Sequence, residues 1–151
     1  MLRVDHVVFP VWDAKASLAF YREVMGFALI DTFGGDDWGG RPWLMMVFAP
    51  GDGRELVLVA LKGAKKPKTY GPAFELPHLA FAERSVKALN AWRKRLAAAD
   101  VAIREERHGP RQSLYFEDPN GLTIEITAPP AQARGKTRPK ALAAAQAWMA
   151  A

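Results

Sequence analysis

The chain contains one sequence pattern twice, and this internal repeat constrains its fold more than any other feature. Residues 4–25 (VDHVVFPVWDAKASLAFYREVM) align with residues 76–97 (LPHLAFAERSVKALNAWRKRLA), which places His6 opposite His78 at a spacing of 72 positions. A pattern that recurs in this way predicts two copies of one supersecondary unit.

A second pair of stretches shows the same repeat. Residues 48–59 (FAPGDGRELVLV) align with residues 116–127 (FEDPNGLTIEIT), now at a spacing of 68 positions. The first copy therefore has about four additional residues, which we place in the glycine-rich stretch 34–40 or in the linker after Leu61.

Each copy predicts a strand, an amphipathic helix and then three further strands. In the first copy Asp13 is a suitable N-cap, apolar residues follow at spacings of three and four, and Gly26 suits the C-terminal cap. In the second copy Ser85 caps a helix with an apolar stripe from Val86 to Leu96. The later strands are expected at residues 27–32, 43–48 and 55–61 in the first copy and at 101–105, 113–116 and 122–127 in the second.

These patterns predict an α+β fold of two βαβββ modules with mixed sheets, which together form one domain. The first module covers residues 1–61, a linker covers 62–75, and the second module covers 76–129. Residues 130–151 form a basic connector followed by a C-terminal helix, because ALAAAQAWMAA has high helix propensity. A helix of this length is marginal alone, so we expect it to dock on its own body or on a partner chain, or else to fray.

Composition removes several classes of function. The chain has no cysteine, which excludes disulfides, thiolate nucleophiles and zinc ribbons, so a metal site must use His, Asp, Glu or water. No apolar run approaches the ~18 residues of a membrane span, and the first residues lack the profile of a signal peptide. The serines have no nucleophile-elbow context, which argues against a serine hydrolase. We therefore expect a soluble, cytoplasmic protein that does not associate with membranes.

The formal charge of +5 is unevenly distributed along the chain. Four basic residues and no acid follow Pro130, so residues 1–129 contain 17 basic and 16 acidic groups. A second basic cluster, between Lys62 and Lys68, lies in the linker. We interpret both clusters as solvated surface rather than phosphate-binding patches, and we expect no nucleic-acid partner.

Strand alternation predicts three metal-binding side chains on one face of the sheets. In the last strand apolar residues alternate with polar ones, so the apolar set meets the helix and Glu125 points to the open face. The same alternation places His6 and His78 on the open face. Imidazole and carboxylate groups bind divalent metals, so we interpret the three residues as a candidate metal site. Taken singly, each histidine could also be a hydrogen-bonded structural residue, and Glu125 a solvated edge carboxylate.

The chain has two βαβββ units with a His in the opening strand of each, and a DPNG turn at 118–121 is followed by a Glu in the TIEI strand. In these features it resembles the vicinal oxygen chelate superfamily. This superfamily includes glyoxalase I, extradiol dioxygenases, methylmalonyl-CoA epimerase, fosfomycin-resistance proteins and metal-free bleomycin-binding proteins. The resemblance covers roughly residues 2–128. It implies two sheets that curl around a central cleft, where a divalent metal chelates two neighbouring oxygens of a substrate. It matches His6, His78 and Glu125 to the metal ligands of the family.

Glyoxalase-like members usually add a fourth ligand, a carboxylate from the last strand of the first unit, and here the match is displaced. The repeat aligns Glu125 with Val57 and places Glu55 two residues away, about 6 to 7 Å along the strand. Glu55 could be a ligand, a catalytic base or a carboxylate at the rim of the cleft. We favour three ligands, which leave coordination positions open for a bidentate substrate or dioxygen.

Further residues are expected to line the cleft. Alternation and the repeat place there a largely apolar set of candidate substrate-binding residues, Trp43, Met45, Val47, Val57 and Val59. The same residues would also suit an ordinary sheet core. Tyr115 faces the cleft, while His108 and Arg111, in the loop RHGPRQS, could supply an acid or base and bind an anionic group, or simply be exposed. The glycines around Trp38 suggest a mobile lid.

We therefore expect a metal-dependent enzyme of glyoxalase or dioxygenase type that acts on a small oxygenated molecule, with Glu55, Tyr115 and His108 as catalytic candidates. The metal, whether zinc, nickel, manganese or iron, would act as a Lewis acid on two substrate oxygens. The alternative is a metal-free protein that binds a hydrophobic or aromatic small molecule without chemistry. Dimers are common in the superfamily, so we also expect a homodimer.

Overall fold

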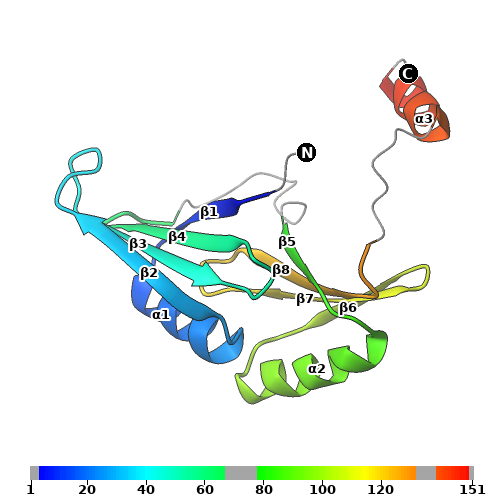
Figure 1. Cartoon of the computed structure of the whole chain (residues 1–151), viewed down its shortest axis with the longest axis horizontal. Helices are drawn as coiled ribbons and strands as arrows, with labels where there is room; N and C mark the ends of the chain where they lie inside the picture. Colours follow the sequence, from blue (N-terminus) through cyan, green and yellow to red (C-terminus); the bar gives the residue numbers. More distant parts are fainter. Residues whose placement is uncertain (1–3, 67–77, 132–138, 150–151) are drawn as a thin grey trace.

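The predicted repeat is present in the computed structural model, which describes residues 4–66, 78–131 and 139–149 (Figure 1). The first unit consists of β1 (His6–Val11), α1 (Ala14–Ala19), a π-helical turn η1 (Phe20–Val24), β2 (Ala28–Gly35), β3 (Trp43–Ala49) and β4 (Glu55–Leu61). The second unit consists of β5 (His78–Ala82), a 3₁₀ turn η2 (Val86–Ala88), α2 (Leu89–Ala98), β6 (Arg104–His108), β7 (Arg111–Glu117) and β8 (Thr123–Ala128). The prediction of an α+β fold with two βαβββ units is confirmed. Most of the predicted linker and of the basic connector falls on residues 67–77 and 132–138, outside the described residues.

Both units form a four-stranded mixed sheet with the same topology. The strand order is β1-β4-β3-β2 in the first sheet and β5-β8-β7-β6 in the second. In each sheet the first and last strands of the unit pair in parallel. Val57 lies opposite Val8, and Glu125 lies opposite Ala80. The equivalence of Val57 and Glu125 inferred from the repeat is therefore confirmed.

The helix ends follow the predicted capping residues. The Asp13 side chain accepts a hydrogen bond from the Ala16 N–H at 2.9 Å, and the Ser85 side chain accepts one from Ala88 at 3.4 Å. These bonds satisfy N–H groups that the first turn of a helix leaves without a partner. Gly26 follows the first helix with a φ of +75°, a conformation that glycine adopts without strain.

The predicted strand at 101–105 is wrong at both ends, because β6 begins three residues later and ends at His108. The Val101 N–H donates to the Leu96 carbonyl at 2.9 Å, so the residues after α2 close the helix end instead of starting a strand. Pairing of β6 with β7 then continues to the hairpin turn, where His108 lies opposite Arg111. Both residues therefore belong to strands, whereas the sequence predicted a loop.

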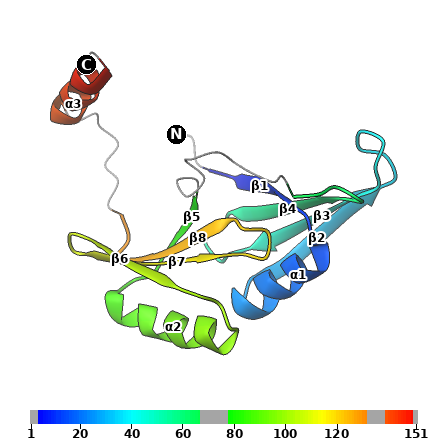
Figure 2. The ribbon, with the colours of Figure 1, turned by 180° about the vertical axis from the view of Figure 1, so that it is seen from behind.

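One apolar core joins the two units on the helix-covered side of the sheets. In both views the first helix and α2 lie on this same side (Figures 1 and 2). The rings of Phe20 and Phe116 have centroids 6.4 Å apart, and those of Phe27 and Phe81 are 5.2 Å apart, so each unit contacts the other directly. The opposite face of each sheet is not covered by a helix of the described chain, and we call these two surfaces the open faces.

The C-terminal helix α3 (Pro139–Met149) lies apart from both sheets (Figures 1 and 2). None of its residues is buried, and Trp148 is 82% exposed. Docking on its own body is therefore not observed for the described residues, and docking on a partner chain stays a prediction. None of the described helices is long and apolar enough to cross a bilayer.

Candidate functional site

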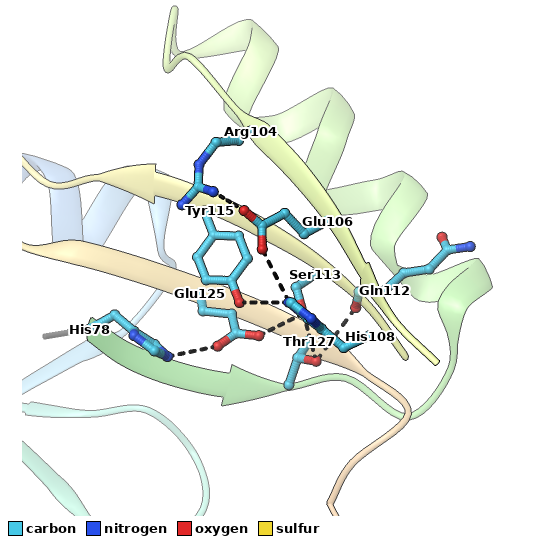
Figure 3. A network of polar contacts seen from close by, with 9 residues as sticks. All are labelled: His78, Arg104, Glu106, His108, Gln112, Ser113, Tyr115, Glu125 and Thr127. Atoms are coloured by element: carbon cyan, nitrogen blue, oxygen red, sulfur yellow. Dashed lines mark hydrogen bonds and ion pairs between the residues drawn. The ribbon is translucent and has the colours of Figure 1, made fainter. Parts of the chain in front are cut away.

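The open face of the second sheet is polar, and it joins two of the three predicted metal ligands. His78 Nε2 lies 3.0 Å from Glu125 Oε2. Glu125 is only 8% exposed, and its other oxygen accepts a hydrogen bond of 2.6 Å from the Ser113 hydroxyl. The Thr127 hydroxyl lies 2.9 Å from the Ser113 oxygen (Figure 3). Hydrogen bonding thus fixes one oxygen of the carboxylate in place and leaves the other facing the imidazole.

A second polar group adjoins this pair on β6 and β7. The Tyr115 hydroxyl lies 3.4 Å from His108 Nε2, which in turn lies 3.2 Å from Glu106 Oε2 (Figure 3). Arg104 forms an ion pair with Glu106, and its guanidinium lies 4.9 Å from the centre of the Tyr115 ring. The rings of Tyr115 and His78 meet edge to face at 5.8 Å, so the two groups form one polar surface.

Tyr115 is electrostatically linked to the candidate ligand Glu125. Burial, together with the charge and hydrogen bonding of Glu125, raises the pKa of the Tyr115 hydroxyl. Tyr115 lies directly opposite Glu125 in the strand register. At neutral pH the phenol therefore keeps its proton and can donate it in a hydrogen bond toward the open face.

His6 lies on the other sheet and has different partners. Its Nδ1 contacts Asp5 Oδ2 at 2.9 Å, and in the strand register it lies opposite Glu55, which is exposed. Among the described residues, no group of three or more His, Asp or Glu side chains is close enough to hold a metal ion. The described part of one chain thus joins His78 with Glu125 and does not add His6 to them.

The predicted substrate-binding residues of the first sheet share its open face. Leu56, Leu58, Met46 and Phe48 belong to the core, so the alternating residues Trp43, Met45, Val47, Val57 and Val59 face the other way. Sequence reasoning missed Phe33, which β2 places opposite Met45 on the same face and which is 50% exposed. The predicted strand ended at residue 32, and the alternation of β2 beyond that point was the signal that could have found Phe33.

Trp38, the centre of the predicted lid, packs against the same surface. Its ring meets that of Trp43 edge to face at 5.3 Å, and the backbone N–H of Trp38 donates to the Arg41 carbonyl at 2.8 Å. Trp38 is still 48% exposed. An aromatic edge therefore borders the apolar open face of the first sheet.

Sequence reasoning also missed a groove at the end of β7. This groove has a volume of about 650 Å³, and its lining includes Tyr115, Arg104, Ile103, Phe116 and Phe20. It forms where the turn after α2 meets the first helix, an arrangement that no local pattern predicts. Tyr115 belongs both to the lining of this groove and to the polar face of the second sheet. The volume of the groove is typical of small-molecule sites.

Two units of identical topology around a shared core define the class of duplicated α+β domains. The sequence profile of the Glyoxalase/Bleomycin resistance protein/Dioxygenase superfamily matches residues 3–126. The chain belongs to this superfamily. Members of the superfamily bind small molecules, and many depend on a metal.

Solved structures of several members have the same fold. A glyoxylase/bleomycin resistance protein/dioxygenase domain from Frankia sp. EAN1pec is 22% identical, with a TM-score of 0.65 over 84% of this chain and 97% of that one. Lactoylglutathione lyase from Agrobacterium tumefaciens is 19% identical, with a TM-score of 0.60 over 83% and 92%. A mutant of the fosfomycin resistance protein FosX from Listeria monocytogenes, complexed with Mn(II) and 1S,2S-dihydroxypropylphosphonic acid, is 19% identical, with a TM-score of 0.63 over 87% and 96%. A search of curated protein sequences gave no match.

Proposed function

We propose that this chain is a metal-dependent enzyme of glyoxalase or dioxygenase type that acts on a small oxygenated molecule. The observation that supports this most directly is the 3.0 Å contact between His78 Nε2 and Glu125 Oε2 on the open face. An imidazole nitrogen and a carboxylate oxygen suit zinc, nickel, manganese and iron alike. The Ser113 hydrogen bond orients the carboxylate, as polar partners of metal ligands commonly do. The Mn(II) complex of the FosX mutant is consistent with a metal in this fold.

We propose His6 as the third donor, supplied by a second copy of the chain. One chain brings His78 and Glu125 together and leaves His6 on the first sheet, half exposed beside Asp5. The open face around His6 also exposes apolar surface, including Val8 at 50%, and such surface is typical of a contact region. A two-fold homodimer that sets the first sheet of each copy against the second sheet of the other completes two identical sites.

The residues around these donors have roles in substrate binding and proton transfer. A divalent ion held there supplies a Lewis acid for two neighbouring oxygens of the substrate. Tyr115 donates a hydrogen bond to a substrate oxygen beside Glu125. His108, whose Nε2 lies 3.4 Å from the Tyr115 hydroxyl, acts as an acid or base that exchanges a proton with the substrate. Glu55 is the first residue of β4 and lies opposite His6 in the register. It acts as a base that accepts a proton from the substrate. Arg111, opposite His108, binds an anionic substituent.

Metal analysis of protein purified without chelator tests the proposal. We expect close to one divalent ion per chain in the native protein and less than a tenth of that in His6→Ala and in His78→Ala. A native protein without bound metal, or a metal content that neither substitution changes, would contradict the proposal. Circular dichroism of both variants controls for loss of fold.

The second candidate function is binding of an aromatic molecule without chemistry. It is favoured by the apolar open face of the first sheet, where Trp43 and Trp38 form an aromatic edge. This function requires no metal, so tight binding of an aromatic probe by metal-free native protein would favour it over the enzyme.

A further inference from the structure

The groove at the end of β7 contains none of the proposed metal ligands, and the proposed function leaves most of it unused. Its two walls are the turn after α2, residues 99–104, and the end of β7 with the turn that follows, residues 115–119. Phe20 of the first unit also lines it, so both units contribute to it. The end of α2 lies beside the first helix (Figure 1), which places the groove at the junction of the units. Small-molecule sites commonly lie at such junctions.

Apolar and aromatic side chains form the inner surface of the groove. Phe20 and Phe116 are 7% and 4% exposed, and their ring centroids lie 6.4 Å apart. Ile103 and Tyr115 are partly buried and add to this surface. Aromatic rings attract organic cations as well as apolar groups. The inner surface therefore suits an organic ligand and admits a positive charge.

Carboxylates outnumber cations around the groove, although the chain as a whole has a formal charge of +5. Asp100, Glu117 and Asp118 line it, and none of the three forms an ion pair with a described residue. Arg104 is the one cation among the described residues of the lining, and it is already paired within β6 (Figure 3). Lys66 approaches the turn after β7 without pairing with any of the three. A positively charged ligand is therefore complementary to this groove.

Asp100 lies where a carboxylate does not stabilise the fold. It follows the C-terminal end of α2 with a φ of +55°, in the left-handed region that glycine and asparagine favour. The C-terminal end of a helix has a partial negative charge, which repels a carboxylate and attracts a cation. The charge of Asp100 therefore adds to the negative potential of the groove and costs stability at the helix end.

We propose that the groove binds a small organic cation, an ammonium group on an aryl or alkyl body, at a site separate from the metal. The apolar body packs against Phe20, Phe116 and Ile103. The ammonium lies between Asp100, at the end of α2, and Glu117 on the opposite wall. The inference does not depend on the proposed function, because none of these residues is a proposed metal ligand.

Titration calorimetry with two probes of similar size tests the inference. Phenethylammonium and 2-phenylethanol share one body and differ in a charged against a neutral end group. We expect native protein that has been dialysed against a chelator to bind phenethylammonium with a Kd below about 1 mM. Its affinity should be at least about fivefold higher than that for the alcohol, as two carboxylates and a helix end together predict.

Asp100→Asn separates a binding role from a structural one, because asparagine has a similar size and tolerates the left-handed conformation. We expect this variant to lower the ratio of the two affinities at least about twofold and to leave the affinity for 2-phenylethanol unchanged. Removal of the charge at the end of α2 should also raise the melting temperature by about 1–4 °C. A loss of binding together with a lower melting temperature would indicate damage to the fold and would count against the inference.

Asp36→Asn is the matched control, because Asp36 is exposed and does not line the groove. It should leave both affinities as in the native protein. Equal affinities of the native protein for the two probes, or no binding of either, would overturn the inference, and so would a ratio that Asp100→Asn does not change. Loss of the preference in protein loaded with zinc would place the ammonium at the metal ligands and would also overturn it.

Discussion

His78 and Glu125 are 47 positions apart in the chain, and the parallel pairing of β5 with β8 brings Nε2 of one to 3.0 Å from Oε2 of the other. Glu125 lies opposite Ala80, two residues beyond His78 on the same face, so the two side chains meet diagonally across neighbouring strands. The equivalent carboxylate position in the first sheet is Val57, so His6 has no such partner on its own sheet. The duplicated units thus differ at the position of the carboxylate that we propose as a metal ligand.

Glu125→Gln is expected to lower the metal content of the purified protein more than 10-fold. The amide has no negative charge and is a weaker ligand, while it keeps the size of the carboxylate and a hydrogen bond with Ser113. The measurement is elemental analysis after dialysis against metal-free buffer. Glu117→Gln is the matched control, because Glu117 is an exposed carboxylate of β7 on the same face. An equal loss in both variants would show that net charge, and not the site, determines the metal content.

Mixing His6→Ala with His78→Ala protein tests whether each site uses two copies of the chain. Homodimers of either variant have no complete site if His6 of one copy joins His78 and Glu125 of the other. After random exchange of subunits, half of the dimers contain both variants and each of these has one intact site, so about a quarter of the native metal content should return. If the site lies within one chain, every chain in the mixture has lost a ligand and mixing restores nothing. Native mass spectrometry checks that the subunits have exchanged.

Tyr21→Phe is expected to destabilise the protein at neutral pH and to reduce its sensitivity to alkali. Tyr21 is fully buried and its hydroxyl donates to Asp118 Oδ2 at 3.1 Å. Burial, together with the Asp118 charge, raises the pKa of Tyr21. Loss of this hydrogen bond should cost about 1–2 kcal/mol at pH 7.

The pH dependence follows from proton binding in the two states. Above about pH 10 the unfolded chain releases the Tyr21 proton and the folded chain retains it, so stability falls as the pH rises further. The Phe variant has no proton to release and should show a smaller decline. Urea denaturation at pH 7 and at about pH 10.5 measures both effects. Parallel declines in the native protein and the variant would show that the folded state does not hold the Tyr21 proton.

The repeat and the strand alternation were sufficient to predict the order of the elements and the faces of the sheets. Both patterns are visible in the sequence without any knowledge of tertiary contacts. Alternation places Glu125 on the face opposite to that of the core residue Ile124, and the repeat assigns Val57 to the equivalent position in the first sheet. The start of β6 was mispredicted because Val101 satisfies the periodicity of a strand while its N–H completes the end of α2.

What the sequence could not predict depends on contacts between the units. His78 contacts Glu125, whereas His6 lies on the other sheet and does not join them. This separation depends on the arrangement of the two sheets relative to each other, which no local sequence pattern encodes. The DPNG turn is a similar case. By sequence it is an ordinary hairpin turn. In the structure the Asn120 side-chain oxygen accepts a hydrogen bond from the backbone N–H of Trp12 at 2.8 Å, so the turn contacts the first unit.

Asn120→Ala is therefore expected to weaken the junction between the units. The Asn120 amide nitrogen donates to the Ser17 hydroxyl at 2.9 Å and to Asp118 at 3.0 Å, and Asn120 is only 6% exposed. Truncation leaves several of these partners without a hydrogen bond in a region from which water is mostly excluded, which should cost about 2–4 kcal/mol in the free energy of unfolding.

Asp52→Ala is the matched control, because the repeat aligns Asp52 with Asn120, but the Asp52 side chain is 51% exposed and pairs with Arg54 on the surface. We expect this control to cost less than about 0.5 kcal/mol. Denaturant unfolding followed by both circular dichroism and tryptophan fluorescence measures the two values, and equal costs for the two variants would show that the DPNG turn is no more than a hairpin connection.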